Sequence, residues 1–359
     1  MKTIAFFNNK GGVGKTTLLY HLAWMFSEMG VRTVALDLDP QSNLTSMFLS
    51  EDRLTELWEN QSAGQTIVAA VAPLLEEGTG DVQTPHLEIV APNLALVPGD
   101  LGLARMEDEL STQWPNCLEG VAKAFRITAA FHRVVTLAAR EFNADLALID
   151  VGPNLGALNR CAVIAADHVA VPLVPDLFSL QGLRNLGPTL NKWRSGWKKR
   201  LEEAPANLYG PPANIVRSCM AAMDESSSGS TGLPAGAMQP AGYVVLQHAV
   251  RQSRPVKAYL RWAEQIPAEY RRAMRLVPGL GNLTLDNDPN CLAQLKHYRS
   301  LMPLAMEARK PIFQLKPADG AIGAHVAAVA DCRKDFHRLS VRLAQATGLE
   351  LPLPEGTLL

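Results

Sequence analysis

A glycine-rich segment near the amino terminus constrains the fold of this chain more than any other feature. Residues 10–17 read Lys-Gly-Gly-Val-Gly-Lys-Thr-Thr. A β-branched and aromatic run at residues 2–8 precedes them, and residues 16–29 carry apolar side chains at helical spacing. A strand, a glycine-rich turn and a helix in this order are the setting of a phosphate-binding loop. The pattern therefore predicts a phosphate site at the start of a helix.

Strand and helix patterns alternate along most of the remaining chain. Strands are predicted at residues 31–38, 144–151, 168–174, 243–246 and 311–315, with a strand or hairpin at 87–97. Helices are predicted at residues 119–142, 155–165, 179–201 and 255–275. This alternation predicts an α/β fold, a doubly wound and mostly parallel sheet with helices on both faces.

Composition fits one elaborated globular domain. The 359 residues are 47% hydrophobic and 19% charged, and no apolar run approaches the ~20 residues that cross a bilayer. A fibre, a disordered chain and an integral membrane protein are thereby excluded. We expect a single domain over residues 1–359, with an acidic elaboration at 50–118, a flexible Ser/Gly/Pro-rich loop at 224–242 and a basic carboxyl-terminal part at 251–359.

The five cysteines and the first residues bear on the compartment. The cysteines are far apart and include no C-x-x-C pair, which gives little support to a disulfide framework or a zinc ribbon. The apolar amino-terminal run leads into glycines and lysines instead of a small-residue cleavage site, which predicts a cytoplasmic protein.

The loop offers groups that can bind the phosphates of a nucleoside triphosphate and the Mg²⁺ that accompanies them. Its glycines let backbone N–H groups converge on phosphate oxygens, while Lys15 reaches the β and γ phosphates and Thr16 is placed to bind Mg²⁺. The predicted nucleotide contacts in the loop are Gly11, Gly12, Val13, Gly14, Lys15, Thr16 and Thr17. The common loop pattern has glycine at the position of Asn9, and this chain has instead a second lysine, Lys10, inside the loop.

With its second lysine, the segment resembles the deviant Walker A loop of the ParA/MinD superfamily of P-loop ATPases. The resemblance implies that ATP and Mg²⁺ are the cofactors and that the chain hydrolyses ATP weakly. It also implies that two subunits form a dimer around two ATP molecules, in which Lys10 crosses to the nucleotide of the partner subunit. Lys10, Lys15 and Asp39 are then the predicted catalytic residues.

Asp39 belongs to a second segment of the resemblance. Residues 37–43, Asp-Leu-Asp-Pro-Gln-Ser-Asn, resemble the segment after the second strand of partition ATPases, the ParA branch of the superfamily. This likeness implies that Asp39 orients the attacking water and that Asp37 lies close to the metal. A carboxylate at a strand end suits this task, because phosphoryl transfer depends mainly on positioning and charge neutralisation.

The third segment resembles a Walker B strand and its following turn. Residues 146–151 are apolar up to Asp150, which the resemblance implies binds Mg²⁺ through water. The turn at Gly152 and Pro153 is implied to sense the γ-phosphate. Gly152 and Asn154 stand where the family commonly has a proline and a serine. Further likeness at residues 166–183 and 310–321 extends the resemblance from about residue 2 to 345, weakest across 50–130 and 190–300.

Members of the superfamily serve different roles, and the sequence separates some of them. An iron-protein reductase would need a second cluster cysteine at a family position, which this chain lacks. Residues 348–359 contain prolines and acids but no lysine or arginine, so we expect no terminal membrane anchor. Non-specific DNA binding, which needs lysines and arginines near phosphates, is the remaining common mode.

Basic residues gather in the second half of the chain. Residues 1–190 hold 12 Lys and Arg against 21 Asp and Glu, and residues 191–359 hold 22 against 14. Residues 192–200 are one candidate DNA surface, although their tryptophans Trp193 and Trp197 are more typical of core anchors. The residues proposed for DNA contact are Arg254, Lys257, Arg261, Arg271 and Arg275. Solvated helix faces, or two faces that pair with each other, remain the alternative for these charges.

The expected function is a ParA-type dimeric ATP switch that positions or segregates DNA or a DNA-tethered cargo, stimulated by a partner protein. The alternative is a regulatory, ATP-dependent protein-binding module without DNA binding, acting through the 50–118 elaboration, for example in a mobile element or a defence locus. Gln247, near the end of a predicted strand, is a candidate adenine contact. His21 is predicted to be structural.

Overall fold

The computed structural model describes residues 1–59, 64–76, 80–206, 208, 232–246, 256–276, 283–298 and 300–352, without the side chains of Glu76 and 256–258. These residues form an eight-stranded sheet in the order β3-β4-β2-β5-β1-β6-β7-β8. The strands are β1 (Lys2–Phe6), β2 (Thr33–Leu38), β3 (Glu88–Ala91), β4 (Leu94–Val97), β5 (Leu146–Val151), β6 (His168–Leu173), β7 (Gln239–Leu246) and β8 (Cys291–Leu295). Only the β3–β4 pair is antiparallel among the described strands, so the predicted sheet is confirmed.

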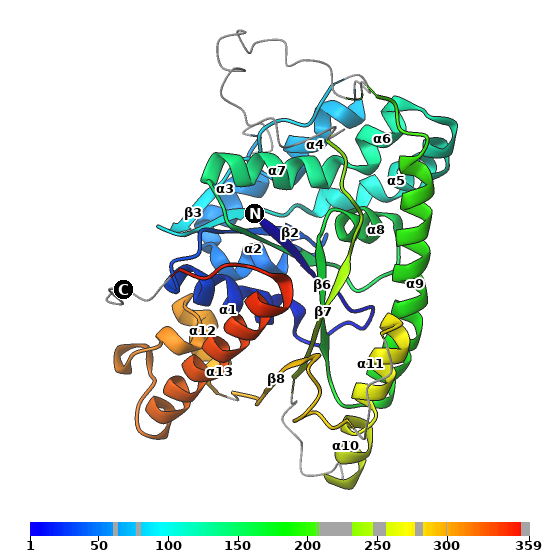
Figure 1. Cartoon of the computed structure of the whole chain (residues 1–359). Helices are drawn as coiled ribbons and strands as arrows, with labels where there is room; N and C mark the ends of the chain where they lie inside the picture. The colour runs from blue at the N-terminus through cyan, green and yellow to red at the C-terminus, as the bar shows by residue number, and fades with distance from the viewer. Residues whose placement is uncertain are drawn as a thin grey trace, which may run out of the picture.

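Helices cover both faces of the sheet (Figure 1). One apolar core lies between the sheet and α4 (Ile67–Glu76), α5 (Met106–Asn116), α6 (Ala122–Thr128), α7 (Ala130–Phe142), α8 (Ala157–Ile164), α9 (Leu177–Leu201) and α11 (Ile266–Met274). The other core joins the sheet to α1 (Lys15–Glu28), α2 (Asn43–Phe48), α3 (Glu51–Glu59), α12 (Leu301–Ala308) and α13 (Ala324–Thr347). α10 (Val256–Ala263) precedes α11.

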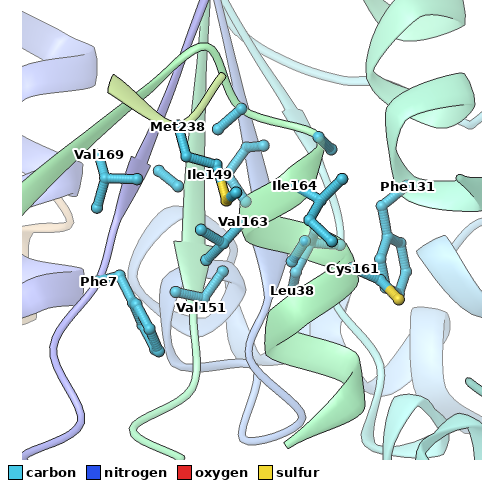
Figure 2. Packing of buried hydrophobic residues seen from close by; sticks show 14 of the residues in the cluster. Phe7, Leu38, Phe131, Ile149, Val151, Cys161, Val163, Ile164, Val169 and Met238 are labelled. Carbon is cyan, nitrogen blue, oxygen red and sulfur yellow. The ribbon is translucent and has the colours of Figure 1, made fainter. Parts of the chain in front are cut away.

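The central strands are buried on both faces, as their continuous apolar runs require. Every residue of β2 and β5 is buried. Figure 2 shows how α8 packs there, with Val163 directed at Ile149 and Val151 of the sheet. This packing fixes α8 against β5, the strand that precedes it in the chain.

The parallel register brings the predicted site residues to one edge of the sheet. Asp150 of β5 is in register with Phe6 of β1 and with Asp37 of β2. The chain therefore leaves these three strands at the same edge, where ligands of doubly wound folds bind.

Several details differ from the sequence prediction. Residues 311–315, predicted as a strand, contain a 3₁₀ helix at Ile312–Gln314, and the sheet position beside β7 belongs to β8, which the sequence analysis missed. Pro311 has no N–H to donate to a sheet. β7 begins at Gln239, inside the segment predicted as a flexible loop, whose residues 224–231 lie outside the described structure.

The 50–118 elaboration contains α3, α4, the β3–β4 hairpin and α5, and the hairpin predicted at 87–97 is confirmed. The helix predicted at 119–142 is divided at Ala129 into α6 and α7, and that predicted at 255–275 is divided into α10 and α11. In the described part of the chain, no helix combines the length and apolar character needed to cross a membrane.

Candidate nucleotide-binding site

The glycine-rich loop joins β1 to α1 and presents unpaired backbone donors. Gly12 and Gly14 have φ angles of +69° and +84°, a region that suits glycine because it has no Cβ. The first helical hydrogen bond of α1 runs from Leu18 N–H to Gly14 C=O at 2.9 Å. The N–H groups of residues 15–17 therefore lie before the helical ladder and are free to meet an anion.

Thr16 and Asp150 face each other beneath the loop. The Thr16 hydroxyl donates to Asp150 Oδ2 at 2.7 Å. The other carboxylate oxygen, Oδ1, is buried without a hydrogen-bond partner among the described residues. Burial, reinforced by the nearby Asp37 carboxylate, raises the pKa of Asp150 to about 8. A cation near this oxygen would relieve the cost of the buried charge.

Asp37 is fully buried behind this pair and already has partners. Its Oδ2 accepts from the Thr45 N–H at 2.8 Å and the Thr45 hydroxyl at 2.7 Å. Burial raises the pKa of Asp37 to about 6, although the Thr45 bonds act against that rise. The structure thus ties Asp37 to the start of α2, and its role as a metal ligand stays a prediction.

Lys15 and Asp39 complete the polar edge of the sheet. The Lys15 side chain is buried, and burial lowers its pKa although the Asp150 and Asp39 charges oppose this effect. Asp39 Oδ1 accepts from the Gln41 N–H at 3.0 Å. A Cβ placed on Gly152 would stand 3.4 Å from the same oxygen, so the turn after β5 lies against Asp39.

The turn after β5 is held by a buried asparagine. Asn159 of α8 donates through its Nδ2 to the carbonyl oxygens of Gly152 at 2.9 Å and Asn154 at 2.8 Å. The same nitrogen lies 3.0 Å from Asn154 Oδ1. The turn predicted to sense a γ-phosphate is therefore ordered by contacts within its own loop and helix.

Two adjoining cavities border the loop. The larger, about 620 Å³, has the loop, Asp39 and Pro153 on one side and the methionines Met47, Met302 and Met306 on the other. The smaller, about 260 Å³, lies between the loop and the apolar residues Leu246, Leu295, Tyr298 and Phe336. Met302 and His21 border both. Their combination of an apolar wall and converging polar groups is typical of a ligand site.

The apolar wall could not be predicted from the sequence, because its residues come from four separate segments without a recognisable motif: Met47, Leu246, residues 295–306 and Phe336. Gln247, the predicted adenine contact, lies outside the described residues. His21 is structural as predicted. Its Nδ1 lies 2.8 Å from the Thr17 carbonyl oxygen, and its Nε2 lies 3.1 Å from the Ile312 nitrogen that donates to it.

Lys10 and Lys15 lie in the same loop but have different partners. It is absent from the residues that border the two cavities, and its ammonium group forms an ion pair with Asp176 at the start of α9. Its Nζ lies 5.9 Å from the ring centre of Phe178, which is 70% exposed. The loop thus directs one lysine toward its own cavities and the other toward the start of α9.

The predicted DNA contacts are divided by the structure. Arg254 and the Lys257 side chain lie outside its described part. Arg271 faces the buried Asp288 at 3.5 Å, which is a structural pairing. Arg261 and Arg275 are exposed, and Arg261 lies over the ring of Trp262.

The 192–200 segment combines core and surface residues. Trp193 and Trp197 are buried core anchors, as the alternative interpretation holds. Arg194 donates to the carbonyl oxygens of Ala237 and Met238. The exposed lysines of the segment are Lys192, Lys198 and Lys199.

A parallel α/β sheet with a glycine-rich loop before its first helix, and with a threonine paired to the aspartate of a neighbouring strand, defines a P-loop nucleoside triphosphatase fold. A family model described as "AAA domain" matches residues 1–203. The chain belongs to this family and to the ParA/MinD superfamily of P-loop ATPases.

Curated relatives include partition proteins. The chain is 34% identical over 190 residues to Protein IncC of Escherichia coli, covering 53% of this chain and 46% of IncC. It is 32% identical over 203 residues to the chromosome-partitioning ATPase Soj of Thermus thermophilus, covering 56% of this chain and 66% of Soj. The match thus spans about half the length of IncC and two thirds of Soj.

Solved structures share the fold over nearly the whole chain. A protein of Corynebacterium diphtheriae superposes with a TM-score of 0.68 at 23% identity, covering 97% of this chain and 99% of that one. The ATP complex of a McdA variant from Cyanothece has a TM-score of 0.55 at 14% identity, with 99% of each chain covered. At these identities the likeness shows the fold.

Proposed function

We propose that this chain is a ParA-type switch that binds ATP with Mg²⁺, dimerises around the nucleotide and hydrolyses it slowly. The observation that carries the proposal is that the two loop lysines have different surroundings and different partners. Lys15 is buried beside Asp39 and Asp150, whereas the half-buried Lys10 is paired with Asp176 and borders neither cavity. Once released from Asp176, a lysine in that position can reach a second subunit.

The oxygen donors beneath the loop fit Mg²⁺. The Thr16 hydroxyl and the unpartnered Asp150 Oδ1 are hard ligands on one side of the loop. The described residues contain no group of three or more His, Cys, Asp or Glu that could hold a metal by itself. This agrees with Mg²⁺ bound by few protein groups together with phosphate oxygens and water. Bound there, Mg²⁺ would neutralise charge that develops on the phosphates.

The protein's own groups would then act as follows. The loop N–H groups and Lys15 bind and orient the phosphates. Asp39, held by the Gln41 N–H, orients the attacking water, and the absence of a side chain at Gly152 leaves room beside its carboxylate. Release of phosphate frees the turn after β5, and this movement weakens the dimer.

The output of the switch is binding to DNA or to a DNA-tethered cargo. The partition role printed in the name of Soj supports this assignment. The exposed residues Lys192, Lys198, Lys199, Arg261 and Arg275 provide positive charge on and around α9 and α11, which pack against each other. Arg254 and Lys257 remain candidates for DNA contact from the sequence alone. We expect the protein to be cytoplasmic and associated with the nucleoid.

A second function, ATP-dependent binding of a protein partner, is favoured by one feature of the elaboration. A cavity of about 860 Å³ lies between α3, α4 and the 3₁₀ helix Leu101–Arg105. Leu101 beside it is 61% exposed. A partner that inserts a side chain here would need no DNA.

Retention on random duplex DNA at increasing salt separates the two functions. The DNA switch predicts salt-sensitive retention with ATP–Mg²⁺ and little retention with ADP. Equal retention in both nucleotide states, or none in either, would contradict it and direct the search to a protein partner.

A further inference from the structure

The helix α8 follows the turn at residues 152–156, here called the sensor turn. A side chain from the 50–118 elaboration binds the amino-terminal end of this helix. Glu107 of α5 accepts from the first two N–H groups of α8, with 2.5 Å from Ala157 N to Oε1 and 2.9 Å from Leu158 N to Oε2. Such N–H groups have no partner inside the helix, and a negative charge there is stabilising. One carboxylate therefore holds the start of α8 with both of its oxygens.

The approach of Glu107 depends on the turn itself. A Cβ placed on Gly156 would stand 2.5 Å from Glu107 Oε1 and 3.0 Å from Asn154 Oδ1. The Gly156 N–H donates to Asn154 Oδ1 at 2.9 Å. Asn159 thus closes the turn from inside, and Glu107 fixes its far end from outside.

A stack of side chains provides a second connection between the elaboration and α8. Arg160 of α8 lies over the ring of Trp114 of α5 at 4.2 Å and donates to the Leu110 carbonyl oxygen at 3.3 Å. Arg200 of α9 lies over the same ring at 3.9 Å and donates to the Trp114 carbonyl oxygen at 2.6 Å. α5 therefore contacts both the helix after the sensor turn and the helix that begins beside Lys10.

We propose that Glu107 is a positioning residue for ATP hydrolysis. By holding the start of α8, it keeps the turn at residues 152–156 in place against Asp39, where the turn responds to the γ-phosphate. Glu107 borders neither of the two cavities beside the loop and acts through the backbone of the turn. The 50–118 elaboration thereby has a direct influence on hydrolysis. This inference rests on the proposed ATPase function.

The test compares Glu107→Ala, which removes both acceptors, with Glu107→Gln, which keeps one oxygen. Asp108→Ala, an exposed neighbour on the same helix turn, is the matched control. Steady-state hydrolysis gives kcat and KM, a fluorescent ATP analogue gives the dissociation constant, and thermal melting shows that each variant is folded. We expect Glu107→Ala to lower kcat about tenfold while KM and the dissociation constant change less than about twofold. Glu107→Gln should recover part of the loss, and Asp108→Ala should resemble wild type.

The outcomes are distinguishable. If kcat of Glu107→Ala equals that of Asp108→Ala, or if ATP binding weakens as much as kcat falls, the positioning role is wrong while the ATPase assignment stands. If Glu107→Ala does not fold, the decision passes to Glu107→Gln, whose kcat must lie clearly below that of Asp108→Ala. Wild-type protein that binds no ATP and hydrolyses none would overturn the inference together with the proposed function.

Discussion

Lys10 and Asp176, 166 residues apart in sequence, form an ion pair that holds the second loop lysine against the first turn of α9. Asp176 Oδ1 also caps that helix by accepting from the Ser179 N–H at 2.8 Å. Burial alone would raise the pKa of Asp176, but the Lys10 ammonium and the Ser179 bond hold it below its usual value. A Lys10 that reaches a partner's nucleotide must therefore leave Asp176 first.

Asp176→Asn should strengthen the ATP-dependent dimer. Asparagine keeps the cap on α9 but removes the charge that holds Lys10. We expect the dimer dissociation constant to fall about fivefold, the scale of a partly exposed ion pair. Sedimentation across a concentration series in ATP–Mg²⁺ measures it. Asp81→Asn, which removes a carboxylate that pairs with Arg133 and borders neither cavity, is the charge-matched control. A weaker dimer in Asp176→Asn alone would contradict this role.

Asp150→Asn should stabilise the nucleotide-free protein while abolishing hydrolysis. The folded-state pKa of Asp150, about 8, lies above its usual 3.8, so its contribution to stability is present at low pH and is lost as pH rises toward 8. Near pH 8 the neutral variant should gain about 2 kcal/mol in unfolding free energy, measured by urea denaturation. It should also lose most of the stabilisation that ATP–Mg²⁺ gives wild type. An unfolding free energy equal to or lower than that of wild type would show that the buried Asp150 carboxylate does not destabilise the folded protein.

His21 should make stability fall in mild acid. Burial lowers its pKa to about 4, and its Nε2 must be unprotonated to accept from the Ile312 N–H. A depressed histidine pKa gives stability that is present above the unfolded-state pKa of about 6.5 and is lost as pH falls toward 4. Between pH 7 and 4.5, wild type should lose about 2 kcal/mol more unfolding free energy than His21→Gln. Parallel pH profiles for the two proteins would exclude this effect.

Arg271 and Arg275 should give opposite results although they lie one helical turn apart. Arg271→Ala removes the positive charge that faces the buried Asp288 and leaves it with neutral donors from Tyr243 and Asn290, so we expect a loss of about 2 kcal/mol in unfolding free energy. Arg275→Ala should leave stability within about 0.5 kcal/mol and weaken retention on DNA. Melting curves and DNA retention on the same samples separate the two roles. Reduced DNA retention with unchanged stability in Arg271→Ala would reverse the assignment.

Much of the fold and the loop could be predicted because local patterns encode them. The apolar run before Asp150, and glycines where φ must be positive, specify the strand and the loop without tertiary information. β8 was missed because its five residues alternate weakly and take their place only by pairing with β7. Propensity alone could not exclude the strand predicted at 311–315.

The side-chain partners at the site could not be predicted, because they come from distant segments. Nothing near Glu107 in the sequence indicates that it meets Ala157, and nothing near Lys10 indicates Asp176. The ion pairs of α11 were likewise hidden, since Asp288 and Arg184 lie outside the basic segment that suggested DNA binding. Sequence pattern identified which residues carry charge, and the fold decides which of those charges are already paired.

ATP-dependent dimerisation through Lys10 is tested by the mass of the protein in solution with ATP–Mg²⁺, with ADP, and in the Lys10→Ala variant. Lys334→Ala, which removes an exposed lysine of α13, is the matched control. The account predicts a dimer with ATP–Mg²⁺ only, formed by wild type and Lys334→Ala and lost in Lys10→Ala. A protein that stays monomeric with ATP–Mg²⁺, or a Lys10→Ala variant that dimerises as wild type does, would contradict it.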